Sequence, residues 1–239
     1  MNVKKFNNPK SIGQQVVKDV ENILKTNERP LICIAGGDTT IPIMEALVSA
    51  GKQNLDFSKT KFISLDEWGG LGRDTQGSCA QTLYDNLFTP LEISEDNIFF
   101  FDGTANLEEE AKKADEFIKS NQQIDYIVLG VGMNGHIGFN EPNVLEETGA
   151  MVVDLDSVTK KVMEKYFNED YSLEQGITLS LNQIRQAKQI VVAITGDHKR
   201  SVYQKTIQFD DDPNFPVSLL KNEGEKFNLY VDSAAYVKE

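Results

Sequence analysis

The sequence predicts an α/β fold built on one open, mostly parallel sheet with helices on both faces. Segments typical of strands and of helices alternate along the whole chain of 239 residues, which is the pattern of such folds. Several predicted strands, for example residues 31–35 (LICIA), are apolar at every position, and this indicates a strand that is covered on both faces. No linker, low-complexity run or internal repeat divides the chain, so we expect one Rossmann-like domain over residues 1–239.

The first half of the chain begins with a predicted amphipathic helix over residues 8–26. Its apolar side chains recur at helical spacing, and Pro30 ends the pattern. Acidic side chains fill the first turn of a second clear helix, which begins LEEEAKK. The predicted elements up to residue 120 are a helix over 8–26, a strand over 31–35, a helix through 43–48, a strand over 60–65, a helix over 75–88, a strand over 97–101 and a helix over 107–120.

The second half opens with residues 125–142 (DYIVLGVGMNGHIGFNEP), which predict a buried strand that runs into a glycine-rich loop. The apolar run QIVVAIT predicts another buried strand over residues 189–195. The predicted elements after residue 142 are a strand over 151–155, a helix over 157–167, an apolar segment over 177–181, a strand over 189–195, a helix over 197–207, a short helix over 216–221 and a strand over 227–231.

The composition excludes several classes of function. Hydrophobic residues make up 40% of the chain and charged residues 26%, with a net charge of −13; this disfavours a nucleic-acid partner, which requires a basic stripe. No apolar run approaches the roughly 20 residues that span a membrane, and the N-terminus lacks an apolar signal core, so we expect a cytoplasmic protein. Cys33 and Cys79 have neither the spacing of a zinc site nor that of a disulfide framework.

The loop within residues 125–142 carries the strongest candidates for catalysis. His136 is one of only two histidines in the chain, and Glu141 follows it by five residues, with Asn134 and Asn140 nearby. A carboxylate orients and charges an imidazole that moves protons. The alternative is a structural histidine that bonds the loop backbone, but a strand-end loop is where open α/β proteins bind ligands, which favours function.

The same loop contains a misleading match to a dinucleotide-binding motif. Residues 130–135 fit G-x-G-x-x-G, and Asp154 and Asp156 follow at about the spacing of a ribose-binding acid. That motif requires a helix that starts within it, whereas Gly138 and Pro142 interrupt any helix here. We therefore do not predict a dinucleotide site.

Three further strand ends carry candidate ligands. Residues 36–40 (GGDTT) follow a buried strand and precede a helix, so they predict either an anion-binding loop or a tight turn in which Asp38 caps the helix. Asp66 follows the strand over 60–65 and is either a pocket carboxylate or a turn residue; Glu67 must point the other way. Lys199 lies at the same rim and is a candidate phosphate ligand.

In combination and in order, these motifs resemble the glucosamine-6-phosphate deaminase/6-phosphogluconolactonase family. The resemblance covers nearly the whole chain, from AGGDTT through LDEWGGL and GVGMNGHIGFNEP to ITGDHKR. The stretch GHIGFNEP is its most specific part and is similar to the deaminases, not to the lactonases. LDEWGGLG and GMNGHIGFNEP resemble the galactosamine-6-phosphate deaminase/isomerase branch.

The resemblance implies a fold, a reaction and roles for individual residues. A 2-amino-2-deoxyhexose 6-phosphate becomes a ketohexose 6-phosphate and ammonia, on a fold of the sugar-phosphate isomerase/deaminase type and without a cofactor or metal. Asp66 matches the general base, His136 the imidazole that assists ring opening, and Glu141 its carboxylate partner. The residues that match the phosphate site are Gly36, Gly37, Asp38, Thr39, Thr40 and Lys199.

Three residues depart from the pattern of the glucosamine enzymes. Asn134 stands where those enzymes usually carry Asp. They use an arginine where the register gives Lys165, and they have a hydroxyl residue where this chain has Asp38. An amide cannot supply a charge that raises the pKa of the histidine. A lysine offers the phosphate a single ammonium charge, whereas an arginine binds it with two parallel N–H donors. These departures imply an altered sugar specificity or a phosphate that is held differently.

Other functions stay open on sequence alone. A 6-phosphogluconolactonase-like hydrolase, an isomerase that releases no ammonia, and a non-catalytic sugar-phosphate sensor are the alternatives. The joint presence of Asp66, His136 and Glu141 argues against a sensor, which needs no base. The sequence leaves open the epimer of the hexosamine and the oligomeric state, monomer or homo-oligomer.

Overall fold

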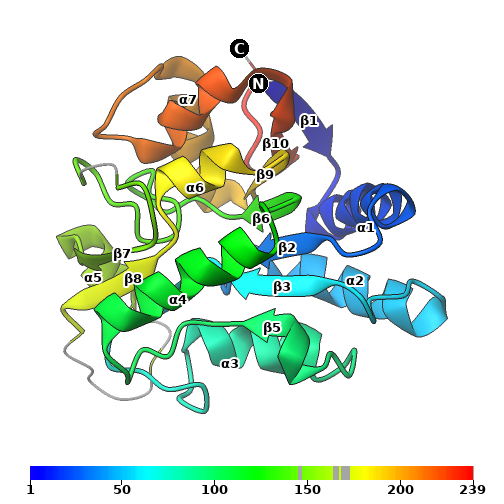
Figure 1. Cartoon of the computed structure of the whole chain (residues 1–239). Coiled ribbons are helices and arrows are strands. Elements are labelled where there is room, and N and C mark those ends of the chain that lie inside the picture. Colours follow the sequence, from blue (N-terminus) through cyan, green and yellow to red (C-terminus); the bar gives the residue numbers. More distant parts are fainter. Residues whose placement is uncertain (145–146, 164–166, 168–172, 239) are drawn as a thin grey trace.

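The computed structural model describes residues 1–238 except 145–146, 164–166 and 168–172, and its central feature is a seven-stranded sheet (Figure 1). Every neighbouring pair of strands in this sheet is parallel. The strand order is β1 (Asn2–Phe6), β10 (Phe227–Asp232), β9 (Gln189–Ile194), β6 (Tyr126–Leu129), β2 (Leu31–Ile34), β3 (Lys61–Ser64) and β5 (Ile98–Phe99). The predicted parallel α/β fold is confirmed.

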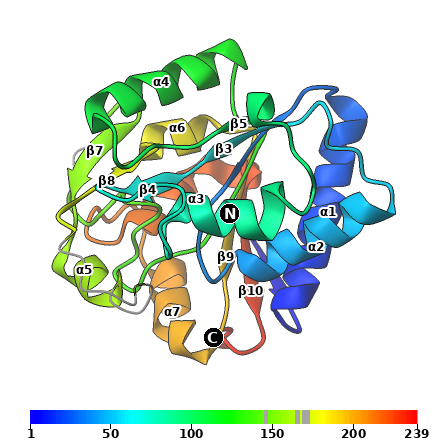
Figure 2. The same cartoon turned by 90° about the horizontal axis from the view of Figure 1, so that it is seen from below.

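Helices cover both faces of the sheet, as Figures 1 and 2 show. One face packs against α1 (Pro9–Thr26), α2 (Ile41–Gln53) and α3 (Cys79–Leu83), and the other against α4 (Leu107–Ser120), α6 (Leu181–Gln186) and α7 (Arg200–Gln208). Successive side chains of a strand point to opposite faces. In β2, Leu31 and Cys33 therefore enter one core, and Ile32 and Ile34 enter the other.

A second, antiparallel sheet of three strands lies beside the main one. Its order is β4 (Asp66–Trp68), β8 (Gln175–Thr178) and β7 (Met151–Asp154). The strand predicted over residues 60–65 ends at Ser64, and the chain then leaves the main sheet to start β4 at Asp66. A separate small core, which includes Trp68 and Phe139, packs against this sheet.

Some elements differ from the sequence prediction. The strand β1 was not predicted. It lies at the edge of the sheet, and its lysines and exposed side chains give it no apolar run by which a buried strand is identified. The apolar segment over 177–181 divides into the end of β8 and the start of α6. The helix predicted over 75–88 is α-helical only from Cys79 to Leu83 and continues as a π-helical turn over Tyr84–Phe88. The helix predicted over 157–167 corresponds to α5 (Ser157–Met163), and part of the remainder lies outside the described residues.

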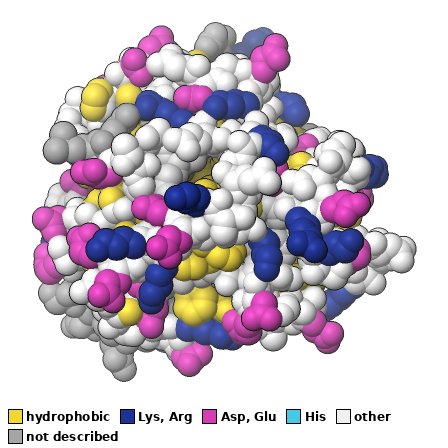
Figure 3. All heavy atoms as spheres, viewed as in Figure 1, with side chains coloured by type: hydrophobic (Ala, Val, Ile, Leu, Met, Phe, Trp, Pro, Cys, Tyr) yellow, Lys and Arg dark blue, Asp and Glu magenta, His cyan; other side chains and the backbone are white. Residues whose placement is uncertain are grey.

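The surface and the helix lengths agree with the composition. Figure 3 shows lysine, arginine and acidic side chains interspersed over one face, with no basic stripe on it. Within the described part of the chain, no helix has both the length and the apolar character that a membrane span requires.

The order of the strands positions the candidate site. From the adjacent central strands β2 and β6, the chain continues towards opposite edges of the sheet: β2 leads to β3, and β6 leads to β9 and β10. Loops that leave such a point diverge and open a crevice at the carboxyl ends of the strands. The loops after β2 and β6 are residues 36–40 and 130–142, the two glycine-rich segments singled out in the sequence.

Candidate active site

A cavity of about 440 Å³ opens at the carboxyl ends of the central strands. It is lined by the loops that follow β2, β3 and β6, by α5, and by the 3-10 turn before α7. The predicted site residues that line it are Gly36, Gly37, Asp38, Thr39, Thr40, Asp66, His136 and Lys199. Segments far apart in sequence therefore meet in one cavity. Lys165 lies outside the described residues.

Asp66 reaches the cavity from the first position of β4. The pairing of β4 with β8 aligns Asp66 with Thr178 and fixes the backbone there. Burial raises the pKa of the Asp66 carboxyl to about 7, while a hydrogen bond with the Cys79 side chain acts in the opposite direction. A carboxylate with a pKa near neutrality is suited to accept a proton from carbon and to return it.

Glu67 points away from the cavity, as the alternation of a strand predicts. Its side chain is 1% exposed and accepts backbone N–H groups from Trp68 at 2.8 Å, from Cys79 at 3.0 Å and from Ala80 at 2.7 Å. Burial raises the Glu67 pKa to about 8, although these three donors favour the ionised form. Glu67 thus joins β4 to the start of α3 and has a structural role.

His136 is held by a carboxylate and a hydroxyl. Its Nδ1 lies 3.4 Å from Oε2 of Glu141 and 3.1 Å from Oγ1 of Thr159 on α5. Glu141 is 3% exposed and does not line the cavity. Burial alone would raise the Glu141 pKa, but its hydrogen bond and charge interaction with His136, together with bonds from Thr159 and Asn134, lower it. Glu141 therefore acts on the cavity through its contacts with His136 and Thr159, both of which line it.

Glycines allow the loop to bring His136 to the cavity wall. A Cβ at position 132 would lie 2.2 Å from the imidazole ring, so only glycine fits beneath it. Gly138 adopts a φ of +55° and packs against Thr178 of β8. Residues 130–142 contain no helix, and this agrees with the rejection of a dinucleotide motif.

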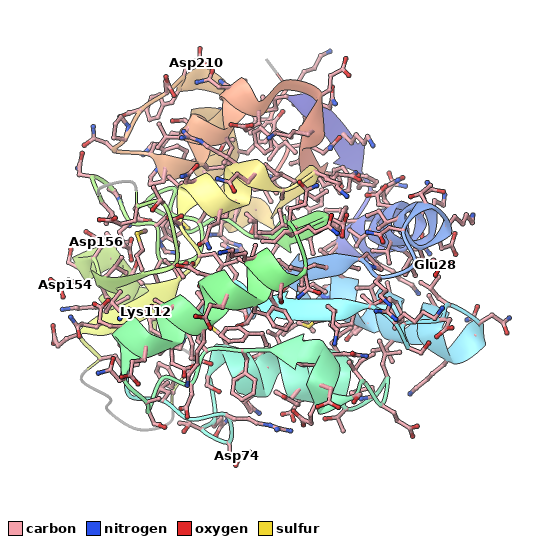
Figure 4. The ribbon with its side chains drawn as sticks, viewed as in Figure 1. Glu28, Asp74, Lys112, Asp154, Asp156 and Asp210 are labelled. Atoms are coloured by element: carbon pink, nitrogen blue, oxygen red, sulfur yellow. The ribbon has the colours of Figure 1, made fainter. Side chains whose placement is uncertain are left out.

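Asn134 connects the histidine loop to two carboxylates. Its Nδ2 donates to Oε2 of Glu141 at 3.1 Å and to Oδ1 of Asp156 at 3.2 Å. Its Oδ1 accepts the backbone N–H of His136 at 3.2 Å. Asp156 also accepts the N–H of Val158 and so begins α5. Asp154, labelled with Asp156 in Figure 4, is exposed and accepts an amide from Gln175. Neither acid lines the cavity.

The substitution Asn134→Asp is expected to destabilise the protein in a pH-dependent manner. It would remove the amide donor and place a third carboxylate beside Glu141 and Asp156, which raises the folded-state pKa of the new group. Stability contributed by a raised carboxyl pKa is present at low pH and lost as pH rises through that pKa. We expect the Tm to fall by about 3–6 °C at pH 8 relative to the wild type, and by less at pH 5. Asn134→Ala removes the donor to Glu141 without adding a charge, so its loss should vary with pH less than that of Asn134→Asp. An Asn134→Asp variant as stable as the wild type at pH 8 would contradict this expectation.

Thr40, and not Asp38, organises the turn between β2 and α2. The Thr40 hydroxyl lies 2.6 Å from the carbonyl of Ala35 and 2.8 Å from that of Gly37. Thr40 occupies the N-cap position of α2, so the alternative in which Asp38 caps this helix is wrong. Asp38 is exposed at the cavity. The segment is a tight turn that also lines the cavity.

Cations reach the cavity from two sides. Lys199 ends a 3-10 turn, Asp197–Lys199, and its Nζ donates to the carbonyl of Val131 in the histidine loop at 2.5 Å. Lys161 of α5 and His198 also line the cavity and were not predicted as site residues. Within the described ranges, no group of three or more His, Cys, Asp or Glu side chains is arranged to hold a metal ion.

Two contacts of the site have no signature in the sequence. Thr159 contacts His136 across 23 positions, and Cys79 contacts Asp66 from the first residue of α3. Trp68 and Phe139 also line the cavity, with ring centroids 4.7 Å apart in an edge-on arrangement. Periodicity predicts that such residues are buried but does not identify their partners.

Comparison with known proteins agrees with this geometry. A family model described as glucosamine-6-phosphate isomerases/6-phosphogluconolactonase matches residues 7–229. The chain is 31% identical to a glucosamine-6-phosphate deaminase of Clostridium novyi (strain NT), over 92% of this chain and 93% of the relative. It is 30% identical to the glucosamine-6-phosphate deaminase of Bacillus pumilus (strain SAFR-032), over 98% of both chains.

Solved structures are similar over almost the full length. A monomeric glucosamine-6-phosphate deaminase superposes with a TM-score of 0.92 at 25% identity, covering 98% of both chains. A 6-phosphogluconolactonase from Thermotoga maritima superposes with a TM-score of 0.76 at 17% identity, covering 97% of this chain and 98% of that one. At this identity the similarity shows a shared fold alone. The two sequence relatives and the more similar solved structure are named for glucosamine 6-phosphate, so these comparisons do not support the expected closeness to the galactosamine branch.

Proposed function

Because the chain belongs to the glucosamine-6-phosphate isomerase/6-phosphogluconolactonase family and is an enzyme of its deaminase type, we propose that it converts a 2-amino-2-deoxyhexose 6-phosphate and water into a ketohexose 6-phosphate and ammonia. The observation that carries the proposal is a single cavity lined by both Asp66, with a pKa near 7, and His136, backed by Glu141. A base and an imidazole at one cavity suit a sugar that must open before it loses a proton from carbon.

The proposed reaction proceeds in three steps. His136, oriented by Glu141, assists transfer of the proton of the C1 hydroxyl to the ring oxygen, and this opens the ring to an aldehyde. Asp66 removes the proton from C2 and returns it to C1, while a proton passes from the C2 nitrogen to the C1 oxygen, so that the aldehyde becomes an alcohol and the amine at C2 becomes an imine. Addition of water to this imine releases ammonia and leaves the ketone at C2.

The phosphate is proposed to lie against the turn over residues 36–40 and Lys199. Backbone N–H groups in a glycine turn and at the start of a helix favour an anion, and Lys199 adds a full positive charge. We propose Lys165, which the structure does not describe, as a second cationic ligand. Asp38 at this rim disfavours close approach of a phosphate on its side of the turn.

An ammonia assay with two substrates tests the proposed function. The names of the relatives favour glucosamine 6-phosphate, whereas the motifs LDEWGGLG and GMNGHIGFNEP favour the galactosamine epimer. The ratio of the two kcat/KM values decides between them. Release of acid from 6-phosphogluconolactone, without ammonia from either aminosugar, would instead identify a lactonase.

Removal of the Lys199 charge is expected to weaken substrate binding more than it slows chemistry. For Lys199→Ala we expect KM to rise about 10- to 100-fold, because a hydrogen bond to a charged group contributes about 1.5–3 kcal/mol, while kcat changes less. Steady-state kinetics with the aminosugar phosphate measure both constants. Lys52→Ala, an exposed lysine in the last turn of α2, is the matched control and should leave KM unchanged. A Lys199 variant with an unchanged KM would show that the phosphate lies elsewhere.

A further inference from the structure

We propose that Cys79 is a positioning residue for Asp66: its thiol donates a hydrogen bond to the Asp66 carboxylate and holds that group at the cavity wall. The inference rests on the proposed function, in which Asp66 moves the substrate proton. The sequence alone indicates no role for this cysteine, since its spacing fits neither a disulfide framework nor a zinc site.

The backbone of Cys79 is fixed from two directions. Its N–H donates to Oε1 of Glu67 at 3.0 Å, and Ser78 caps the helix that begins there by accepting the N–H of Gln81 at 3.0 Å. On the opposite side, a Cβ at Gly36 would lie 2.7 Å from the Cys79 carbonyl oxygen. Cys79 is therefore clamped between the strand that carries the base and the turn proposed to bind phosphate.

The side chain of Cys79 lies in the cavity that Asp66 also lines. Cys79 is 5% exposed, lines the same cavity as Asp66, and shares a hydrogen bond with its carboxylate. Burial, together with the charges of Asp66 and Glu67, raises the pKa of the Cys79 thiol well above its usual value. The thiol thus keeps its proton, and a carboxylate without a proton can only accept.

A weak donor suits a base whose pKa must stay near neutrality. Hydrogen bonds to a carboxylate favour its charged form and lower its pKa, and an S–H group does so less than an O–H group. The thiol fixes the orientation of Asp66 with little loss of basicity. Glu67 on the same strand and Cys33 on β2 interact with the charge of Asp66. The other titratable side chains that line the cavity among the described residues are Asp38, His136, Lys161, His198 and Lys199.

The pH dependence of kcat/KM for Cys79→Ser and Cys79→Ala tests the proposal. The acid limb of this profile, where kcat/KM falls as the pH is lowered, reports the pKa of the base in the free enzyme. We expect this limb to move down by about 0.5–1 pH unit in the serine variant, which has the stronger donor, and up by a similar amount in the alanine variant, which has none. Cys33→Ala, which removes another buried thiol near Asp66, is the control and should leave the limb in place. Shifts in one direction, or no shift, in two folded Cys79 variants would overturn the proposal.

A second measurement does not depend on turnover. The ¹³C signal of the Asp66 carboxyl, assigned by its loss in Asp66→Asn, is titrated in the wild type and both Cys79 variants. Opposite shifts of this pKa in the two variants support the positioning role even if no aminosugar releases ammonia, an outcome that would refute the proposed function alone. Unchanged titration in a protein that does release ammonia would refute the role of Cys79 alone. If the alanine variant does not fold, the serine variant retains the test, because its downward shift is required.

Discussion

Asp66→Asn is expected to lower kcat/KM for ammonia release by at least about 10²-fold, the usual contribution of a general base. An amide has nearly the shape of the carboxylate but cannot accept a proton at neutral pH, so the C2 proton stays on the substrate. Substrate affinity, measured by equilibrium binding, should change little, because the proposed phosphate ligands are intact. Near-normal turnover would show that another group is the base.

The same substitution is expected to stabilise the protein at high pH. The folded-state pKa of Asp66 is about 7, above the ordinary value of 3.8. A carboxyl with a raised pKa contributes stability at low pH that is lost as pH rises through its folded pKa. Asparagine has no such dependence, so the Tm of the variant should exceed that of the wild type by about 2–6 °C at pH 8, and by less at pH 4.

An exposed aspartate provides the control for both measurements. Asp74 lies at the edge of the molecule in Figure 4 and is exposed. It does not line the cavity. Asp74→Asn should preserve kcat/KM and should leave the pH dependence of the Tm unchanged. A gain in Tm for Asp66→Asn that did not vary with pH would indicate a packing effect and not the release of a buried charge.

The sequence predicted the fold and the strand ends well because both depend on local patterns. Apolar runs such as residues 31–35 identify buried strands, and glycine turns mark where they end. The strand β4 escaped prediction because it has three residues and pairs with β8 more than 100 positions away. Its stability comes from that pairing and not from local propensity.

The contacts within the site were less predictable than its members. Asp66, His136 and Lys199 were expected at one rim, and the structure brings them to one cavity. The sequence left open whether Asp38 caps the helix after GGDTT. The structure gives the N-cap position to Thr40, whose hydroxyl bonds carbonyls of the turn. The roles of Cys79 and of the amide that bridges Glu141 and Asp156 depend on packing between distant elements, which no local pattern records.

His136→Ala is expected to lower kcat/KM by about 10²-fold, because the enzyme would then depend on sugar that opens spontaneously. Glu141 would lose the histidine that lowers its pKa, so the variant should also lose stability as pH rises.

Free imidazole distinguishes this defect from a defect in the base. It can enter the space left by the side chain and should partly restore ammonia release by the His136 variant, whereas the Asp66→Asn variant should not respond.

Gly132→Ala tests the orientation of the His136 ring. The added Cβ would lie 2.2 Å from the imidazole and must displace it, so activity should fall although both His136 and Glu141 are present. At Gly72, the matched control, a Cβ would approach no closer than 3.4 Å to another side chain, and Gly72→Ala should remain active. Full activity in Gly132→Ala would mean that the orientation of His136 does not limit the reaction.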